Sequence, residues 1–304
     1  MRKVKNILGI NEIHRRGIKG KGSCVAILDS GIASHPDFNH RIIEFKDFIN
    51  DRKENYDDEG HGTHVAGIIA GDGTLSRGIM CGIAPEAEIV SLKVLDKHGR
   101  GKERDVIDGI WWIIDNGKKY NVKVVNISFG TISNSNNENH QLIEAVELLW
   151  DLGYVVVAAA GNNGPVPSSI STPGDCRKII TVGAENDNIK TFVNGKLTKN
   201  YSGRGPTRQC IQKPDIVAPA NDIYSCCNLW NKNYTYISKS GTSMATPIVT
   251  GVVCLMLSQH KMTNVECKKL IKSTAIDLKM DKNRQGWGRI NPEKILNFNS
   301  NLRN

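Results

Sequence analysis

Residues 24–31, with the sequence CVAILDSG, decide the fold class of this 304-residue chain. Five apolar residues in a row, with no polar alternation, are typical of a strand buried on both faces of a parallel sheet. The run ends directly on Asp29, and open α/β sheets place their functional residues just past the carboxyl ends of the strands. The stretch therefore predicts a buried strand with a carboxylate at its functional end, although in isolation a turn or a helix cap also explains Asp29.

The rest of the chain alternates short apolar runs with longer amphipathic segments. Further strands are predicted at residues 89–94, 122–127, 155–160, 179–182 and 215–218. Residues 104–120 and 141–152 carry apolar residues three to four positions apart, which is the spacing of helices that pack one face on a sheet. This alternation predicts an α/β fold of three layers, in which helices cover both faces of a mostly parallel β-sheet. We expect a single domain over residues 1–304, with a polar excursion at 190–213, a surface loop at 133–139 and a polar tail at 298–304.

Two further motifs carry residues of hydrolytic chemistry. Residues 60–67, GHGTHVAG, place His61 at the start of a predicted helix, and residues 240–247, SGTSMATP, place Ser243 at the N-terminus of a helix that is apolar nearly all round. The His-x-x-His spacing of His61 and His64 could bind a metal, but it lacks the glutamate of a zincin and a nearby third ligand, so a metal is the weaker interpretation. Taken on its own, Ser243 is more simply interpreted as the cap of this helix. Together with an aspartate that orients the imidazole, a histidine and a serine form a relay in which the serine attacks a carbonyl.

In its motifs and in the chain order Asp, His, Ser, the sequence resembles the subtilisin-like serine proteases over about residues 18–276, with features of their intracellular bacterial branch. The resemblance implies that Asp29, His61 and Ser243 form the catalytic triad, with His61 as general base and His64 in a structural role. Residues 158–164, AAAGNNG, resemble the oxyanion strand of the family. Asn162 is then expected to bind the oxyanion together with the backbone N–H of Ser243. The implied activity is that of a serine endopeptidase.

The same resemblance implies two edges and a floor for the substrate cleft, each able to accept an extended peptide as an added strand. The expected residues are Gly99, Arg100 and Gly101 at one edge, Ser128, Phe129 and Gly130 at the other, and Ala159, Ala160 and Gly161 on the floor. Residues 171–174 resemble the far wall. Because no acidic residue is placed at the pocket base, we expect an apolar or medium-sized side chain before the cleaved bond. Asp175, near the rim, is the residue that could reverse this expectation.

The family's usual structural ion is calcium, and no cofactor is expected for catalysis. Asp37 matches one typical calcium-ligand position, but the loop at residues 71–78 has an unfamiliar length and carries Arg77 where a cation would sit, so calcium is left open. About 28 residues precede Asp29, and they hold neither a secretory signal nor a propeptide. We therefore expect a cytoplasmic protein, or a secreted one if the chain is a mature fragment. A separate propeptide or an inhibitor is an expected partner beside the polypeptide substrates.

Composition excludes several other classes of protein. With 39% hydrophobic and 23% charged residues the chain is globular, not disordered or coiled-coil. Its 40 basic and 31 acidic residues give a net charge of +9, but these charges are dispersed and lack interleaved aromatics, which disfavours a nucleic-acid-binding module. Apolar runs such as 252–257 are too short to span a bilayer, so no membrane partner is expected.

Eight cysteines without CxxC spacing indicate neither a zinc site nor a redox motif, and we interpret them as free thiols in a reducing compartment. No metal ligands are assigned. The remaining alternative is a catalytically silent scaffold of the same fold. The presence of all four catalytic residue types argues against it, because a silent copy has no chemical need for them.

Overall fold

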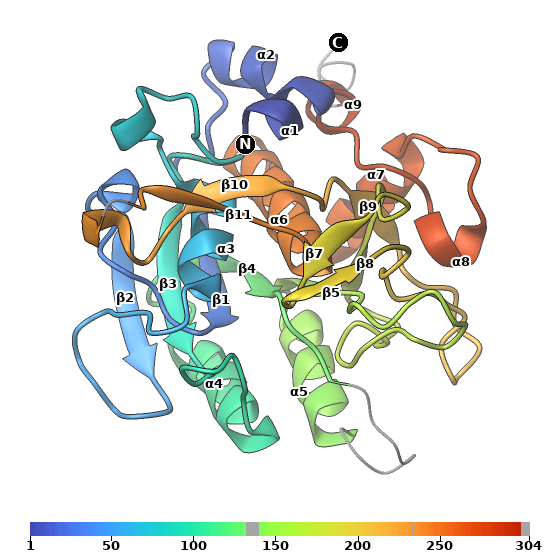
Figure 1. The fold of residues 1–304 in the computed structure, drawn as a ribbon, viewed down its shortest axis with the longest axis horizontal. Coiled ribbons are helices and arrows are strands. Elements are labelled where there is room, and N and C mark those ends of the chain that lie inside the picture. The colour runs from blue at the N-terminus through green and yellow to red at the C-terminus, as the bar shows by residue number, and fades with distance from the viewer. Residues whose placement is uncertain (132–139, 233, 299–304) are drawn as a thin grey trace.

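A computed structural model describes residues 1–131, 140–232 and 234–298 (Figure 1). Its main sheet has the strand order β2-β3-β1-β4-β5-β6-β9, and every neighbouring pair in it is parallel. The strands are β1 (Cys24–Asp29), β2 (Ile42–Asp47), β3 (Glu88–Lys93), β4 (Val122–Ile127), β5 (Val155–Ala159), β6 (Ile180–Ala184) and β9 (Ile216–Ala218). Since all seven run the same way, their carboxyl ends lie along one edge of the sheet.

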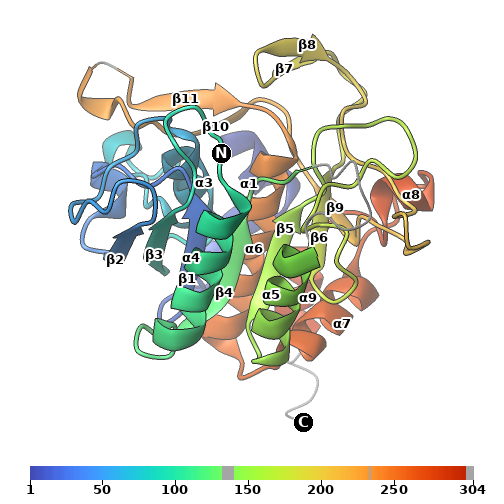
Figure 2. The ribbon, with the colours of Figure 1, turned by 90° about the horizontal axis from the view of Figure 1, so that it is seen from below.

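Helices cover both faces of this sheet, which confirms the predicted three-layer α/β fold (Figure 2). On one face α4 (Glu103–Asn116) and α5 (His140–Asp151) pack side by side. On the other face α3 (His61–Ala70) packs on β1 and β3, and α6 (Thr242–Gln259) packs on β4, β5, β6 and β9. The central strands are therefore covered on both faces, which is why they are continuous apolar runs.

Smaller elements surround the three layers. The remaining helices are α1 (Arg2–Ile7), α2 (Ile10–Arg15), α7 (Asn264–Thr274), α8 (Lys282–Gln285) and α9 (Pro292–Asn297), with short 3-10 turns η1 (Pro36–Phe38), η2 (Thr74–Ser76) and η3 (Trp230–Lys232). Two antiparallel ribbons complete the fold: β7 (Thr191–Val193) with β8 (Lys196–Thr198), and β10 (Ile223–Cys226) with β11 (Tyr236–Lys239). The predicted excursion at 190–213 thus contains the first ribbon. The predicted loop at 133–139 and nearly all of the predicted tail lie outside the described residues.

The buried helix α6 starts at Thr242, so Ser243 lies in its first turn, as the sequence predicts, and Pro247 lies inside the helix. Because proline has no backbone N–H, the carbonyl of Ser243 lacks the usual helical partner four residues on. By length and composition α6 could span a membrane, yet 78% of its most apolar window is buried in the protein, as in the core helix of a globular fold.

A buried polar contact joins α6 to the sheet beneath the carboxyl ends of the strands. The Asn126 amide donates to the Ser128 hydroxyl at 2.8 Å and accepts from the Thr250 hydroxyl at 2.8 Å, and all three side chains are shielded from solvent. Since buried polar groups are costly unless they are paired, this contact fixes how the end of β4 meets the helix. All eight cysteines carry free thiols.

Candidate active site

A cleft of about 540 Å³ lies where β4 and β5 end and where α3 and α6 begin. The predicted residues His61, Asn162 and Ser243 all line it. His61 is the first residue of α3, Ser243 is the second residue of α6, and Asn162 follows β5 by three positions. Residues that are far apart in the chain therefore meet at one edge of the sheet, as its parallel topology requires.

Asp29 holds the imidazole of His61 from behind the cleft. Its carboxylate is 1% exposed, and Oδ1 accepts from the backbone N–H of Ser30 at 2.8 Å and from His61 Nδ1 at 2.7 Å. Because a carboxylate only accepts, Nδ1 carries the hydrogen and Nε2 keeps its lone pair. The side chain of His61 remains 20% exposed. This tautomer is the one that a general base needs.

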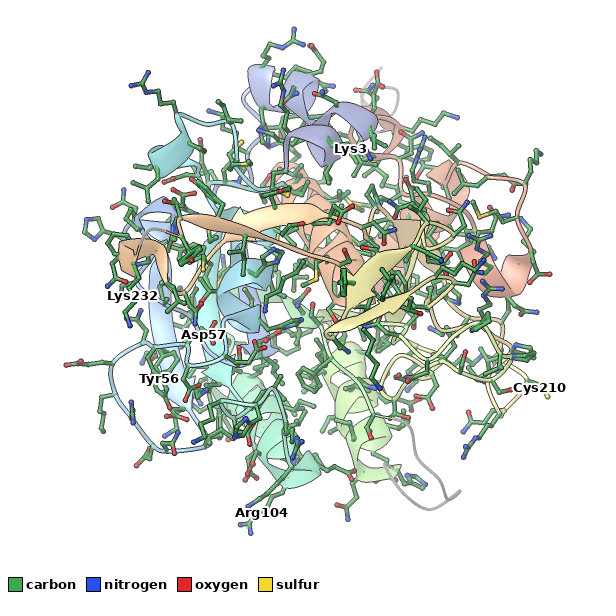
Figure 3. All side chains as sticks on the ribbon, viewed as in Figure 1. Lys3, Tyr56, Asp57, Arg104, Cys210 and Lys232 are labelled. Carbon is green, nitrogen blue, oxygen red and sulfur yellow. The ribbon has the colours of Figure 1, made fainter. Side chains whose placement is uncertain are left out.

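The start of α3 is held against the end of β1 by Asp57, a residue that no sequence motif indicated (Figure 3). Its carboxylate accepts from the N–H of Gly60 at 2.7 Å and from the N–H of Thr63 at 2.9 Å. The hydroxyl of Ser30 donates to it as well, at 2.9 Å. A Cβ atom on Gly62 would overlap the carbonyl oxygen of Gly31, so only glycine allows the helix to approach this closely. These contacts place His61 over Asp29.

The two histidines of the His-x-x-His motif have opposite electrostatic environments. Burial acts to lower the pKa of His61, but the charge and hydrogen bond of Asp29 outweigh it and leave the pKa raised above its ordinary 6.5. Burial lowers the pKa of His64 to about 3. His64 Nε2 lies 2.9 Å from the carbonyl oxygen of Ile223 and 3.1 Å from that of Ile237, so it donates to the β10–β11 ribbon. His64 therefore stays neutral and points away from the triad.

Asn162 is oriented by the first turn of α6. Its Oδ1 accepts from the backbone N–H and from the hydroxyl of Thr242, both at 3.0 Å, which leaves Nδ2 as the free donor of the amide. The neighbouring Asn163 donates to the Ser171 hydroxyl at 3.0 Å and is thereby committed elsewhere. No hydrogen bond joins His61 to Ser243, both of which the structure describes. Catalytic hydrogen bonds are often long without substrate.

Most of the predicted substrate-contacting residues line this cleft, namely Gly99, Ser128, Phe129, Gly130, Ala159 and Gly161. The predicted residues Arg100, Gly101 and Ala160 are not part of its lining. A side chain at Gly101 would meet Leu95, so this glycine faces the protein. The cleft has further lining residues that the predicted set lacks: Glu59, Leu95, His98, Asn163, Ser171 and Asn194. Of these, Ser171 belongs to the segment that resembles the far wall, whereas Asn194 comes from the turn between β7 and β8, which carried no sequence signal.

Asp175 lies outside the cleft lining. Its carboxylate accepts from the hydroxyl of Thr172 at 3.0 Å, and burial raises its pKa. It lines a separate cavity with Glu147 and Cys176. The carboxylate that does line the cleft is Glu59, which accepts from the His61 backbone N–H at 2.5 Å and lies 3.7 Å from Lys239.

Comparison with known proteins shows which family this chain resembles. A sequence profile described as the subtilase family matches residues 20–288. Serine protease AprX of Bacillus subtilis is 40% identical over 94% of this chain and 69% of its own length. Subtilisin BL of Lederbergia lenta is 37% identical over 92% of this chain and 93% of its own. Among solved structures, S41 psychrophilic protease has a TM-score of 0.76 at 32% identity, and sphericase has 0.76 at 30%; each match covers 90% of this chain and 92% of the other.

The Asp29–His61 contact can be tested by titration. We expect the pKa of His61 to lie above 6.5 and to fall in Asp29→Asn, because the amide carries no charge. NMR titration of the histidine rings in a Ser243→Ala background measures this and avoids self-digestion. Glu59→Gln is the matched control with a smaller fall, and His64 should stay neutral down to about pH 3. An unchanged His61 pKa in Asp29→Asn would contradict the geometry.

Proposed function

The chain belongs to the subtilase family and is a serine-type endopeptidase, and we propose that it cleaves polypeptides through an acyl-enzyme on Ser243. The observation that carries this proposal is the Asp29–His61 hydrogen bond of 2.7 Å, behind a cleft that His61 and Ser243 both line. It supplies a base of the correct tautomer beside a hydroxyl at a helix N-terminus.

In the proposed reaction His61 moves a proton twice. Nε2 takes the proton of the Ser243 hydroxyl as Oγ forms a bond to the substrate carbonyl carbon. The same proton then passes to the leaving amine as the C–N bond breaks, and a water molecule repeats the sequence to release the acid product. The charge of Asp29 is proposed to stabilise the imidazolium that forms, in the same way that it raises the pKa of His61.

Asn162 and the N-terminus of α6 are proposed to stabilise the oxyanion. Nδ2 of Asn162 is left free because Oδ1 is held by Thr242, so the donor is oriented before substrate binds. The backbone N–H of Ser243, in the first turn of α6, is the second proposed donor, and the helix dipole favours negative charge at this place.

The walls of the cleft suit an extended polypeptide with an apolar or medium-sized side chain before the cleaved bond. Ala159 and Gly161 carry little side chain, which leaves room above the floor, and Phe129 adds an apolar surface. Glu59 is the carboxylate among the lining residues, and its contacts with the His61 N–H and with Lys239 offset its charge. The proposed preference therefore rests on the volume and apolarity of the cleft.

A cytoplasmic location and a separate propeptide or inhibitor stay predictions from sequence.

Active-site labelling tests the nucleophile. A fluorophosphonate probe should label the folded wild type, and Ser243→Ala should abolish labelling, because the probe forms its bond with the activated serine oxygen. Mass mapping of the labelled peptide identifies the residue. Folded wild-type protein that takes up no probe would favour a silent scaffold, and labelling that persists in Ser243→Ala would place the nucleophile elsewhere.

Removal of the Asn162 amide tests the oxyanion donor. We expect Asn162→Ala to lower kcat by about 100- to 1,000-fold with little change in KM, which is the magnitude known for such a donor in this family. Asn163→Ala is the matched control, because that neighbouring amide lines the same cleft but donates to Ser171. Steady-state kinetics on one peptide substrate measure both variants. Equal losses of kcat in the two variants would remove Asn162 from the proposed role.

A peptide panel tests the side-chain preference. Peptides that vary only in the residue before the cleaved bond should be cleaved with the highest kcat/KM when that residue is apolar or medium-sized, because the cleft floor is built of small residues. Glu59→Gln should leave this ranking unchanged. Exclusive cleavage after Arg or Lys would overturn the proposed preference.

A further inference from the structure

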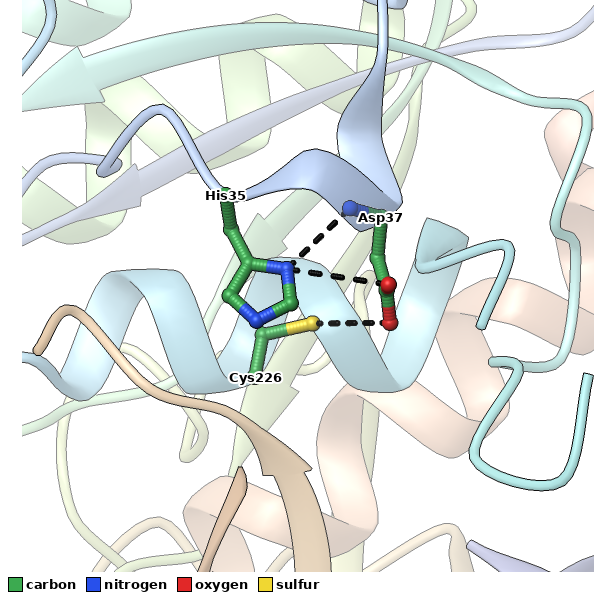
Figure 4. A group of neighbouring side chains, drawn as sticks. All are labelled: His35, Asp37 and Cys226. Carbon is green, nitrogen blue, oxygen red and sulfur yellow. Dashed lines mark hydrogen bonds and ion pairs between the residues drawn. The ribbon is translucent and has the colours of Figure 1, made fainter. Parts of the chain in front are cut away.

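Three buried side chains with metal-binding atoms meet outside the cleft lining (Figure 4). His35 and Asp37 flank the start of η1, and Cys226 is the last residue of β10, 189 positions beyond Asp37. Their ligand atoms all lie within 4.8 Å of one another. The exposed fractions are 2%, 0% and 1%, so the cluster is closed to solvent.

Two of the three ligands, His35 and Asp37, are held by partners outside the cluster. His35 Nε2 lies 3.0 Å from the carbonyl oxygen of Thr235, which only accepts, so Nε2 carries the hydrogen and Nδ1 has the lone pair. Nδ1 accepts from the N–H of Asp37 and lies 3.8 Å from Asp37 Oδ1. The carboxylate accepts from the N–H of Leu75 at 3.0 Å and from the hydroxyl of Tyr236 at 2.8 Å. Such outer contacts orient ligands and select the tautomer in metal sites.

Among the described residues, no Lys or Arg binds the carboxylate of the cluster directly. The donors to the Asp37 carboxylate are a backbone N–H, the Tyr236 phenol and the Cys226 thiol. The guanidinium of Arg41 binds the backbone carbonyl of Asp37 instead and acts on the carboxylate only through space. His35 is within ion-pair distance at 3.8 Å, but its Nδ1 accepts a hydrogen bond and is therefore not protonated. Buried carboxylates are usually paired with a cation or bind a metal.

These donors do not fit calcium, the ion expected from the family resemblance. Calcium takes six to eight oxygen ligands, whereas this cluster offers an imidazole nitrogen and a sulfur beside one carboxylate. The oxygen atoms beside the cluster already have a cation, the guanidinium of Arg41, whereas the side chain of Arg77 is exposed. Its guanidinium binds the carbonyl oxygens of Asp37 and Ala70 and lies 3.4 Å from the Asp72 carboxylate. Nitrogen, sulfur and carboxylate ligands together are typical of zinc.

We propose that His35, Asp37 and Cys226 form a structural zinc site. The protein ligands are Nδ1 of His35, one carboxylate oxygen of Asp37 and Sγ of Cys226, and a water molecule is the fourth ligand. The Nδ1 lone pair passes from the N–H of Asp37, which now donates to it, to the metal, so that hydrogen bond breaks as the zinc–nitrogen bond forms. As the S–Zn bond forms, the thiol proton leaves to solvent. The two charges of Zn²⁺ then balance the carboxylate and the thiolate, which gives a neutral centre closed to bulk solvent. The absence of CxxC spacing argued against zinc, but the fold joins ligands that no local motif contains.

The site would fasten the β10–β11 ribbon to the rest of the molecule. Cys226 ends β10 and Tyr236 begins β11, while carbonyls of the same ribbon accept from His64 of α3. A metal bound at Asp37 therefore restrains the surface on which the helix of His61 packs. Stabilisation follows by mass action because the unfolded chain does not hold the three ligands together.

Metal loading of the full chain, in a Ser243→Ala background, tests the proposal. After removal of bound metal with a chelator and equilibration with zinc, elemental analysis should find about one zinc per chain. The Tm should rise by about 5 °C at free zinc roughly 100-fold above Kd. Cobalt in place of zinc should give a thiolate-to-cobalt absorption band.

Cys226→Ser is the decisive variant, because the serine hydroxyl can still donate to Asp37 while the soft ligand is lost. It should abolish the cobalt band and weaken zinc binding at least 10-fold, and His35→Asn should weaken binding similarly. Cys227→Ser is the matched control, since this adjacent thiol is also buried but contacts Asn228 and Leu229. Wild-type protein that retains no zinc would overturn the proposal even if Cys226→Ser fails to fold. Binding that survives in Cys226→Ser, is lost equally in Cys227→Ser, or occurs with calcium but not with zinc would also overturn it.

Discussion

The contact between His61 Nδ1 and Asp29 Oδ1, 2.7 Å long, is the constraint that the surrounding structure serves. Burying a carboxylate that is 1% exposed costs free energy unless a hydrogen-bond partner is present. The imidazole that pairs with it must therefore be held in position by the surrounding structure. The parallel sheet brings the end of β1 to the functional edge, and Gly62 lets α3 approach it closely. The register of β1 against β3 also places a cation beside this strand end. Lys93 of β3 lies opposite Asp29, and its ammonium donates to the carbonyl oxygen of Ser30 at 2.6 Å.

The central fold could be predicted from sequence because its signals are local. Strands buried on both faces must be continuous apolar runs, so β1, β4 and β5 are visible in the chain itself. The edge strand β2 was missed because most of its residues are only half-buried, and the β10–β11 ribbon because it mixes buried and exposed positions.

The residues of the candidate site also differ in how far sequence could predict them. Asp29, His61, Asn162 and Ser243 each follow or begin a predicted element, so sequence places them near one edge. Which atoms face one another depends on contacts between distant segments, such as Thr242 with Asn162 or Ser30 with Asp57. Those contacts have no local pattern. Asn194 reaches the cleft from a short ribbon, and Cys226 reaches Asp37 across 189 positions, so neither could be assigned from spacing.

The two histidines of α3 give the molecule two separate responses to acid. His61 has a raised pKa, so it loses the lone pair that its proposed role as general base needs as the pH falls through a value above 6.5, while its charged pair with Asp29 favours the folded state. His64 has a pKa lowered to about 3 by burial, and its Nδ1 has no hydrogen-bond partner. Its contribution to stability is complete above 6.5 and is lost as the pH falls toward 3, at about 1.4 kcal/mol per pH unit. The proposed catalysis is therefore lost at a higher pH than the stability that His64 contributes. The two histidines of α3 differ because His61 contacts the buried carboxylate of Asp29, whereas His64 contacts neutral carbonyl oxygens.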